Sequence, residues 1–190
     1  MKIQELVYKN RSYRRFYQDC TIDRALLEEL VDLGRVSASG SNLQPLKYML
    51  SYEVETNRQI FPYLAWAGYL KEWSGPEEGE RPSAYIIILG DTSIAKKFGY
   101  DHGIAAQSIL LGAAEKGLGG CMIGAIRRAE LSSTLNIPAQ YEVLLVLALG
   151  VAKETVRLTS IPEGGSIEYY RTSDGVHYVP KRTLTEIVLN

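Results

Sequence analysis

The spacing of apolar residues along the chain predicts a mixture of helices and strands. Ile3, Leu6 and Val7 fall on one side of a short helix, and a longer apolar stripe predicts a helix over 22–36 with Thr21 at its N-cap. Further helices are expected over 56–64 and 129–135. Strands are expected over 47–52, 85–89, 143–149 and 185–189, with a hairpin over 168–178 that turns at Asp174-Gly175.

Residues 104–118 are apolar nearly all round. A helix that is apolar on every side must be buried on every side. In a chain of 190 residues, we therefore expect a central helix that packs partly against a second subunit.

The predicted helices and strands do not follow the strict strand–helix–strand order of a doubly wound sheet, which favours an α+β fold. The length and the lack of a linker-like stretch indicate one domain over 1–190. Within it, residues 63–82 form a candidate lid, because Tyr63, Trp66, Tyr69 and Trp73 precede an acidic loop. These four rings are explained equally well as plain core and as a hydrophobic cover over a ring-shaped substrate.

Composition and charge limit the classes of function. A net charge of -1 gives no global field for nucleic acid, and the apolar runs are too short to span a bilayer. Cys20 and Cys121 lie far apart, and His102 and His177 have no partner at metal-ligand spacing, so we expect neither a disulfide framework nor a metal site. With no signal-peptide pattern in the mixed, polar N-terminus, the chain is expected in the cytoplasm.

Basic residues gather near both ends of the chain. The segment Lys9-Asn10-Arg11-Ser12-Tyr13-Arg14-Arg15-Phe16 carries four cations, and Pro180-Lys181-Arg182 adds two more. Arginine is suited to phosphate, because its planar fork donates two parallel charge-assisted hydrogen bonds. The two segments therefore suggest one anionic ligand held by both ends, although the first could also be a solvated helix end.

Two further segments are candidates for ligand contact. Residues 39–45 are dense in short hydrogen-bonding side chains, which is typical either of a polar turn or of groups that read the edge of a heterocycle. Residues 117–124 are rich in glycine but follow a predicted helix rather than a strand, so they do not form a dinucleotide-binding fingerprint. Gly117 is expected to end that helix, and the backbone after it could approach a flat ligand closely.

Taken in order, these segments resemble the nitroreductase family of FMN-dependent oxidoreductases. The matching segments span almost the whole chain and are Arg11-Ser12-Tyr13-Arg14-Arg15-Phe16, Ser39-x-x-Asn42-x-Gln44-Pro45, Asp101-x-Gly103-Ile104-Ala105-Ala106-Gln107, Gly117-Leu118-Gly119-Gly120-Cys121-Met122-Ile123-Gly124, the strand from Tyr141 to Gly150, and Pro180-Lys181-Arg182. The chain departs from the family pattern at Asn10, where a basic residue is usual, and we expect Arg11 to compensate. It also has Ala38 and Leu46 where proline and an aromatic residue are frequent, which bears on the shape of the pocket.

The resemblance implies a nitroreductase-like α+β fold with a central, mostly antiparallel sheet flanked by helices. It implies an intertwined homodimer with two FMN sites at the subunit interface, which agrees with the all-round apolar segment at 104–118. It also implies roles for particular residues. Arg11, Lys181 and Arg182 are expected to hold the FMN phosphate, and Ser12 and Arg14 to lie near the ribityl chain and the pyrimidine edge.

Further contacts follow from the same resemblance. Ser39, Asn42 and Gln44, the last two from the partner subunit, are expected to hydrogen-bond the ring edge or the ribityl chain. Backbone amides around Gly119 and Gly120 are expected near the flavin N5. Tyr13 and Cys121 lie within the matching motifs and are counted among the cofactor-binding residues.

The expected activity is a ping-pong transfer of hydride from NADH or NADPH through FMN to a flat small-molecule acceptor such as a nitroaromatic or a quinone. FMN carries this chemistry, so no catalytic side-chain pair is needed. Two alternatives stay open. The first is a reductive dehalogenase or flavin-fragmenting enzyme related to the same family, and the second is a flavin-binding or sensory module without turnover.

Overall fold

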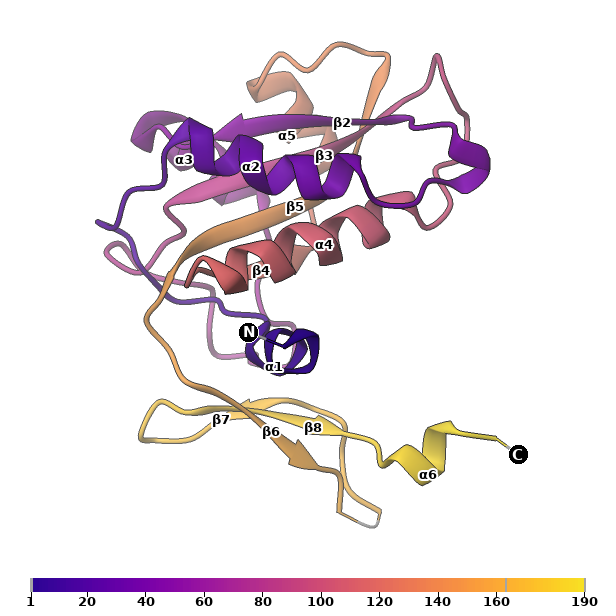
Figure 1. The fold of residues 1–190 in the computed structure, drawn as a ribbon. Coiled ribbons are helices and arrows are strands. Elements are labelled where there is room, and N and C mark those ends of the chain that lie inside the picture. Colours follow the sequence, from indigo (N-terminus) through magenta and orange to yellow (C-terminus); the bar gives the residue numbers. More distant parts are fainter. Residues whose placement is uncertain (1, 163, 190) are drawn as a thin grey trace.

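The computed structural model describes residues 2–162 and 164–189 (Figure 1). Its helices are α1 (Ile3–Lys9), α2 (Arg24–Arg35), α3 (Val54–Ile60), α4 (Asp101–Glu115), α5 (Arg128–Thr134) and α6 (Leu184–Ile187). Its strands are β1 (Phe16–Tyr17), β2 (Leu46–Ser51), β3 (Ala84–Asp91), β4 (Gly119–Ile123), β5 (Tyr141–Ala152), β6 (Val156–Ser160), β7 (Tyr170–Arg171) and β8 (His177–Lys181). Two short 3₁₀ helices cover Gly40–Asn42 and Phe61–Tyr63.

A five-stranded antiparallel sheet forms the centre of the molecule. Strand β3 pairs with β2 on one side and with β5 on the other, and β5 also pairs with β4 and β1. Ile87 lies opposite Met49 in β2 and opposite Val146 in β5. Helices together with this sheet confirm the expected α+β class.

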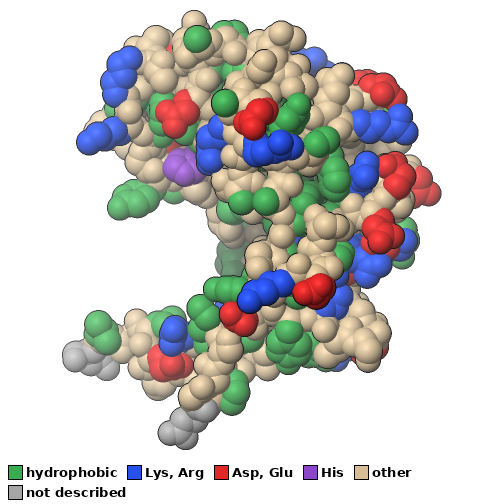
Figure 2. Space-filling view, turned by 180° about the vertical axis from the view of Figure 1, so that it is seen from behind, with side chains coloured by type: hydrophobic (Ala, Val, Ile, Leu, Met, Phe, Trp, Pro, Cys, Tyr) green, Lys and Arg blue, Asp and Glu red, His purple; other side chains and the backbone are tan. Residues whose placement is uncertain are grey.

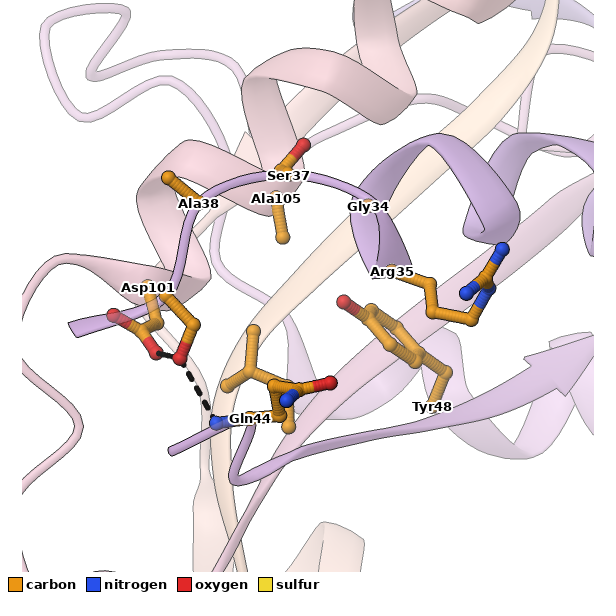
Figure 3. A pocket seen from close by; sticks show the side chains of 10 residues that line it. Gly34, Arg35, Ser37, Ala38, Gln44, Tyr48, Asp101 and Ala105 are labelled. Atoms are coloured by element: carbon orange, nitrogen blue, oxygen red, sulfur yellow. Dashed lines mark hydrogen bonds between the residues drawn. The ribbon is translucent and has the colours of Figure 1, made fainter. Parts of the chain in front are cut away.

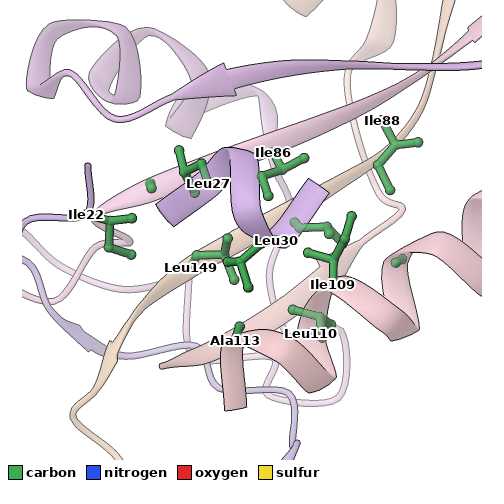
Figure 4. Packing of buried hydrophobic residues seen from close by; sticks show 12 residues of the cluster. Ile22, Leu27, Leu30, Ile86, Ile88, Ile109, Leu110, Ala113 and Leu149 are labelled. Atoms are coloured by element: carbon green, nitrogen blue, oxygen red, sulfur yellow. The ribbon is translucent and has the colours of Figure 1, made fainter. Parts of the chain in front are cut away.

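Both faces of the sheet are covered, because all eight residues of β3 are buried. Ile86 and Ile88 point to a cluster built with α2 and α4, which contribute Leu30 and Ile109 (Figure 4). The alternate residues of β3 point to a second cluster, to which α3 and α5 contribute Ile60 and Leu131. This alternation is the period of two that a strand imposes.

Helix α4 is less enclosed than the sequence pattern suggested. Ala105, Ala106 and Ile109 are buried, but Ile104 is 40% exposed and Gln107 is exposed. The helix ends as expected at Gly117, which has φ +83. There the amide of Leu118 donates to the Ala113 carbonyl at 2.8 Å, which is the Schellman arrangement.

Two local expectations were wrong, and one strand was missed. The N-cap of α2 is Asp23, whose carboxylate accepts from the amide of Leu26, and Thr21 lies outside the helix. The expected strand over 185–189 is not formed, because Thr183 and Glu186 make a capping box that begins α6. The glycine-rich segment contains strand β4, which sequence patterning did not predict.

A second sheet, with the order β6-β8-β7, follows β5. The expected hairpin is confirmed, since Tyr170 in β7 lies opposite Tyr178 in β8 and Gly175 turns with φ +82. Figure 1 shows this sheet and α6 apart from the main body, and Figure 2 shows the surface deeply hollowed between the two. No helix among the described residues is long and apolar enough to cross a membrane.

Candidate functional site

A cavity of about 360 Å³ lies where the loop after α1 meets α4, β4 and the C-terminal sheet. The residues that line it are Asn10, Arg11, Ser12, Arg14, Gln107, Leu110, Gly120, Met122, Tyr169, Val179 and Lys181. The cavity thus joins residues from both ends of the chain, as the two basic segments suggested.

The charge of this cavity is strongly positive. Arg11, Arg14 and Lys181 line it, and no acidic side chain is among the described lining residues. Nε of Arg11 is buried and has no hydrogen-bond partner within the described part of the chain, although Nη2 of the same side chain donates to the Val7 carbonyl. A buried donor without an acceptor is costly, so an anion in this cavity satisfies both the charge and the hydrogen bond.

The loop that carries these cations is fixed against β4. The amide of Tyr13 donates to the Gly120 carbonyl at 3.0 Å, and its hydroxyl donates to the Lys9 carbonyl at 3.1 Å. A Cβ at Gly119 would lie 2.7 Å from the Tyr13 ring, so glycine is needed for this close approach. Tyr13 therefore anchors the loop and does not line the cavity.

Arg14 is held at three points. Its backbone amide donates to Glu154, and Nη1 donates to the Ser12 carbonyl and lies 3.3 Å from Nε2 of His177. Its guanidinium carbon lies 4.9 Å from the centre of the Tyr169 ring, within cation–π range.

Glu154 is a buried carboxylate whose side chain is 1% exposed. Besides the Arg14 amide, it accepts a hydrogen bond from Nη2 of Arg171 at 2.9 Å. Arg171 in turn lies over the ring of Trp73 at 4.6 Å. Both oxygens of this carboxylate are thus used to join the N-terminal loop to the C-terminal sheet.

His177 is buried next to these charges. Burial, and then the positive charge of Arg14, lower the pKa of His177 to about 4, against the opposing effect of Glu154. The unfolded chain therefore binds more protons than the folded chain between about pH 4 and pH 6.5. The stabilisation from neutral His177 is complete above this window and is lost as the pH falls through it.

We expect His177→Gln to reduce the loss of stability between pH 6.5 and pH 4. The measurement is urea unfolding at several pH values in wild type and variant. His102→Gln is the matched control, because it removes the other histidine, on α4. An acid-induced loss in His177→Gln as steep as in wild type would contradict the buried, neutral state of this imidazole.

The structure brings five of the expected cofactor residues together, and these are Arg11, Ser12, Arg14, Gly120 and Lys181. Arg182 lies outside the cavity lining and pairs with Glu186 at 3.5 Å. Gly119 and Cys121 are also outside it, because alternate residues of β4 point to opposite sides, and Gly120 and Met122 are the ones that reach the cavity. The thiol of Cys121 belongs to the second core cluster, where burial raises its pKa.

The other expected polar loop lies elsewhere in the chain. Gln44 lines a separate cavity of about 150 Å³ (Figure 3), and Ser39 lines the same cavity. Asn42 lines neither cavity. Oγ of Ser39 donates to Asp101 at 2.6 Å and accepts from the amide of Gln44 at 2.9 Å. The Gly40 amide donates to the other Asp101 oxygen at 2.9 Å, so Asp101 fixes this loop.

The loop also carries backbone strain. Ser41, Asn42 and Gln44 have φ values of +50, +56 and +52, a region that side-chain-bearing residues rarely adopt. Such strain persists only where the surrounding contacts enforce it, and it is often found at ligand sites.

The aromatic residues of 63–82 have different surroundings. Trp66 is 8% exposed in the second core cluster, and Tyr63 packs against the same cluster. Trp73 lies under Arg171. Tyr69 approaches the cavity, since its ring is 4.9 Å from that of the cavity-lining Tyr169 in an edge contact. In the isolated chain, the core explanation therefore fits Trp66, which belongs to this cluster, and Tyr63 and Trp73, which both pack against it.

Several residues of this site were not singled out by role in the sequence. Gln107 was part of a matching motif, and its exposed position on a largely apolar helix is a usable signal. Tyr169, His177 and Glu154 gave no signal, because their roles depend on how the C-terminal sheet folds over the N-terminal loop. No cluster of three metal-ligating side chains occurs in the described ranges 2–162 and 164–189.

Comparison with known proteins gives a family match. The model of the nitroreductase family matches residues 7–78 and 82–151. A nitroreductase family protein from Streptococcus pneumoniae has the same fold with a TM-score of 0.73, at 15% identity over 100% of both chains. An FMN-dependent nitroreductase from Clostridium difficile has a TM-score of 0.69, at 18% identity over 99% of this chain and 98% of that one.

A third solved structure is the NADPH:FMN oxidoreductase of Vibrio harveyi in complex with NAD+. It matches with a TM-score of 0.62 and 22% identity, over 80% of this chain and 69% of the other. At these low identities, the similarities to solved structures show a shared fold and nothing more specific.

Proposed function

Because the chain belongs to the nitroreductase family, we propose that it is an FMN-dependent oxidoreductase that passes a hydride from NADH or NADPH to a flat organic acceptor. The observation that carries this proposal is the cavity that joins Arg11, Arg14 and Lys181 beside apolar side chains. Such a cavity suits a ligand with an anionic end and a flat, apolar ring.

The residues present fit FMN. The buried Nε of Arg11 offers an unused donor for a phosphate, and Lys181 adds a second cation from the other end of the chain. Ser12 and Asn10 supply polar groups for a ribityl chain, and Leu110, Met122 and Val179 supply apolar surface for a ring. No acidic lining residue opposes the phosphate within the described chain.

Bound FMN supplies the hydride-transfer chemistry. The residues of the chain bind it and set the electrostatics around it. Arg11 and Lys181 would hold the phosphate by charge, and Arg14 would supply a fixed positive charge to stabilise negative charge on the ring. Tyr169 contributes an aromatic ring to the cavity wall.

We further propose that the active form is a homodimer, in which a second copy brings its 39–44 loop to this cavity. The support is that Asn42 and Gln44 are exposed and lie on a strained, well-fixed loop outside the cavity of their own chain. Large apolar residues are also exposed on the isolated chain, among them Ile3, Tyr100, Leu184, Ile187 and Leu189. The free thiols of Cys20 and Cys121 agree with a reducing cytoplasm.

The nicotinamide and then the acceptor are proposed to use the same open side of the cavity in turn. The NADPH:FMN oxidoreductase of Vibrio harveyi supports a nicotinamide donor, and the aromatic pair Tyr69–Tyr169 supports a flat acceptor such as a quinone or nitroaromatic.

The test is an absorption spectrum of the purified protein with added FMN, recorded before and after anaerobic addition of NADH or NADPH. A bound flavin spectrum that bleaches and returns with a quinone is the expected result. A flavin that stays oxidised with both donors would favour a binding or sensory module. Absence of flavin binding would overturn the proposal.

We expect Tyr169→Ala to lower kcat/KM for a quinone acceptor about tenfold while the Kd of FMN changes less than about threefold, since an aromatic contact contributes about 1.5 kcal/mol at most. Steady-state kinetics and FMN fluorescence titration measure the two quantities. Tyr170→Ala is the matched control, because the neighbouring ring stacks on Tyr178 and does not line the cavity. Equal effects of the two variants on kcat/KM would remove Tyr169 from the acceptor site.

A further inference from the structure

The environment of Arg14 comes from a part of the chain beyond the family match. The matched region ends at residue 151, whereas Glu154, Tyr169 and His177 all follow it. These residues lie 140 to 163 positions from Arg14 in sequence and reach it through the C-terminal sheet. The orientation of this cavity cation is therefore determined by residues outside the span of the family match.

Backbone and side chain of Arg14 are held separately. Glu154 holds the backbone amide, so the position of the main chain does not require His177. His177 instead contacts the guanidinium, with Nε2 3.3 Å from Nη1. The two rings of Tyr169 and His177, with centres 5.2 Å apart, bound the space in which the guanidinium lies.

The direction of this hydrogen bond follows from charge. Arginine has donors only, so Nε2 of His177 must be the acceptor and the ring proton must lie on Nδ1. That Nδ1 is buried without a hydrogen-bond partner among the described residues. In this tautomer the Nδ1–H donor is left without an acceptor. The opposite tautomer would be less favourable, because it would direct Nε2–H against the donors of the guanidinium.

A buried histidine often has only a packing role. Here, however, the imidazole is 1% exposed and contacts the head group of a cavity-lining cation, while it leaves its own Nδ1 unpaired. An apolar ring of similar size would fill the same space without that cost. The arrangement is therefore explained by what the acceptor does for Arg14.

We propose that His177 is a positioning residue, which accepts a hydrogen bond from Arg14 and thereby keeps the guanidinium at the flavin edge, where it raises the reduction potential of the bound flavin. This inference rests on the proposed function, since it concerns the same cavity. It adds a determinant of flavin potential that lies outside the cavity lining.

The test compares His177→Phe, His177→Gln, Arg14→Ala and the double variant His177→Phe/Arg14→Ala. Wild type is first shown to bind FMN and to be reduced, so that failure of the proposed function is recognised separately. The readouts are the flavin midpoint potential and the Kd of FMN. We expect His177→Phe to lower the potential toward that of Arg14→Ala and to weaken FMN binding by about tenfold, as for a lost hydrogen bond to a charged group.

Glutamine places an amide oxygen near the position of Nε2, so His177→Gln is expected to restore most of the potential. In the Arg14→Ala background, His177→Phe is expected to change the potential no further, because its effect acts through Arg14. Glu80→Gln is the matched control, since it alters the ion pair of the adjacent Arg15 and should leave the potential unchanged.

An unchanged potential in flavin-loaded His177→Phe would overturn the proposal, and so would effects of His177→Phe and Arg14→Ala that simply add. If His177→Phe does not fold, the wild-type tautomer decides the matter. The chain has two histidines, so the ¹⁵N signals of His177 can be assigned with one variant of His102. A proton on Nδ1 at neutral pH is expected, and a proton on Nε2 would overturn the proposal.

Discussion

Arg11→Ala is expected to weaken FMN binding about 10- to 100-fold, because it removes charge-assisted hydrogen bonds to the phosphate. The buried Nε of Arg11 has no hydrogen-bond partner in the described chain, and Arg11 lines the cavity, so its guanidinium retains an unused donor there. Lys181→Ala should have a smaller effect, since an ammonium group binds phosphate as a point charge without the planar fork.

Arg182→Ala is the matched control for this prediction. Its side chain is 57% exposed, pairs with Glu186 and lies outside the cavity lining, so FMN affinity should change little. Fluorescence titration of apoprotein with FMN at two salt concentrations provides the measurement. Similar losses in Arg11→Ala and Arg182→Ala would show that general charge, rather than the cavity, holds the phosphate.

Glu154→Ala is expected to reduce the free energy of unfolding by about 3–5 kcal/mol, the usual cost of leaving a buried charge without its partner. The substitution removes the acceptor for Arg171 and for the Arg14 amide at once. Because these two bonds join the loop after α1 to the C-terminal sheet, FMN binding should weaken together with stability. Urea unfolding of the apoprotein measures the first effect.

Glu28→Ala is the control for charge removal at the surface, where Glu28 pairs with Arg24. Exposed ion pairs in general contribute about 0–1 kcal/mol. Glu154→Gln should retain part of the stability, since an amide oxygen still accepts from one of the two donors. A loss below about 1 kcal/mol in Glu154→Ala would mean that water replaces the carboxylate and that the C-terminal sheet is not held by it.

The central sheet could be predicted because its strands are long and apolar. The run at 85–89 has few polar residues and is buried on both faces as β3, and β5 follows the same pattern. Strand β4 could not be predicted in this way, because glycine has low strand propensity. At Gly120 a Cβ would lie 2.4 Å from Leu110, so packing against α4 requires glycine there.

The site was predictable only where short segments carry it. The cations Arg11, Arg14 and Lys181 were identified from local clusters, and the structure places them in one cavity. Arg182 looked equivalent to Lys181 in sequence, but it lies beyond the end of β8 and pairs with Glu186. Glu154 and His177 could not be identified, because long-range folding alone gives them their contacts with Arg14.

The strained 39–44 loop has a consequence for engineering heat tolerance. A left-handed residue that carries a side chain stores about 1–2 kcal/mol, and less where it is asparagine, so glycine relieves strain at position 41 and to a smaller extent at position 42. A library selected only for survival on heating would therefore accumulate glycine at these positions. Asn42 is also proposed to serve the second copy's cavity, so the same selection would remove a ligand contact and lower turnover. A screen that scores residual activity after heating would separate the two outcomes.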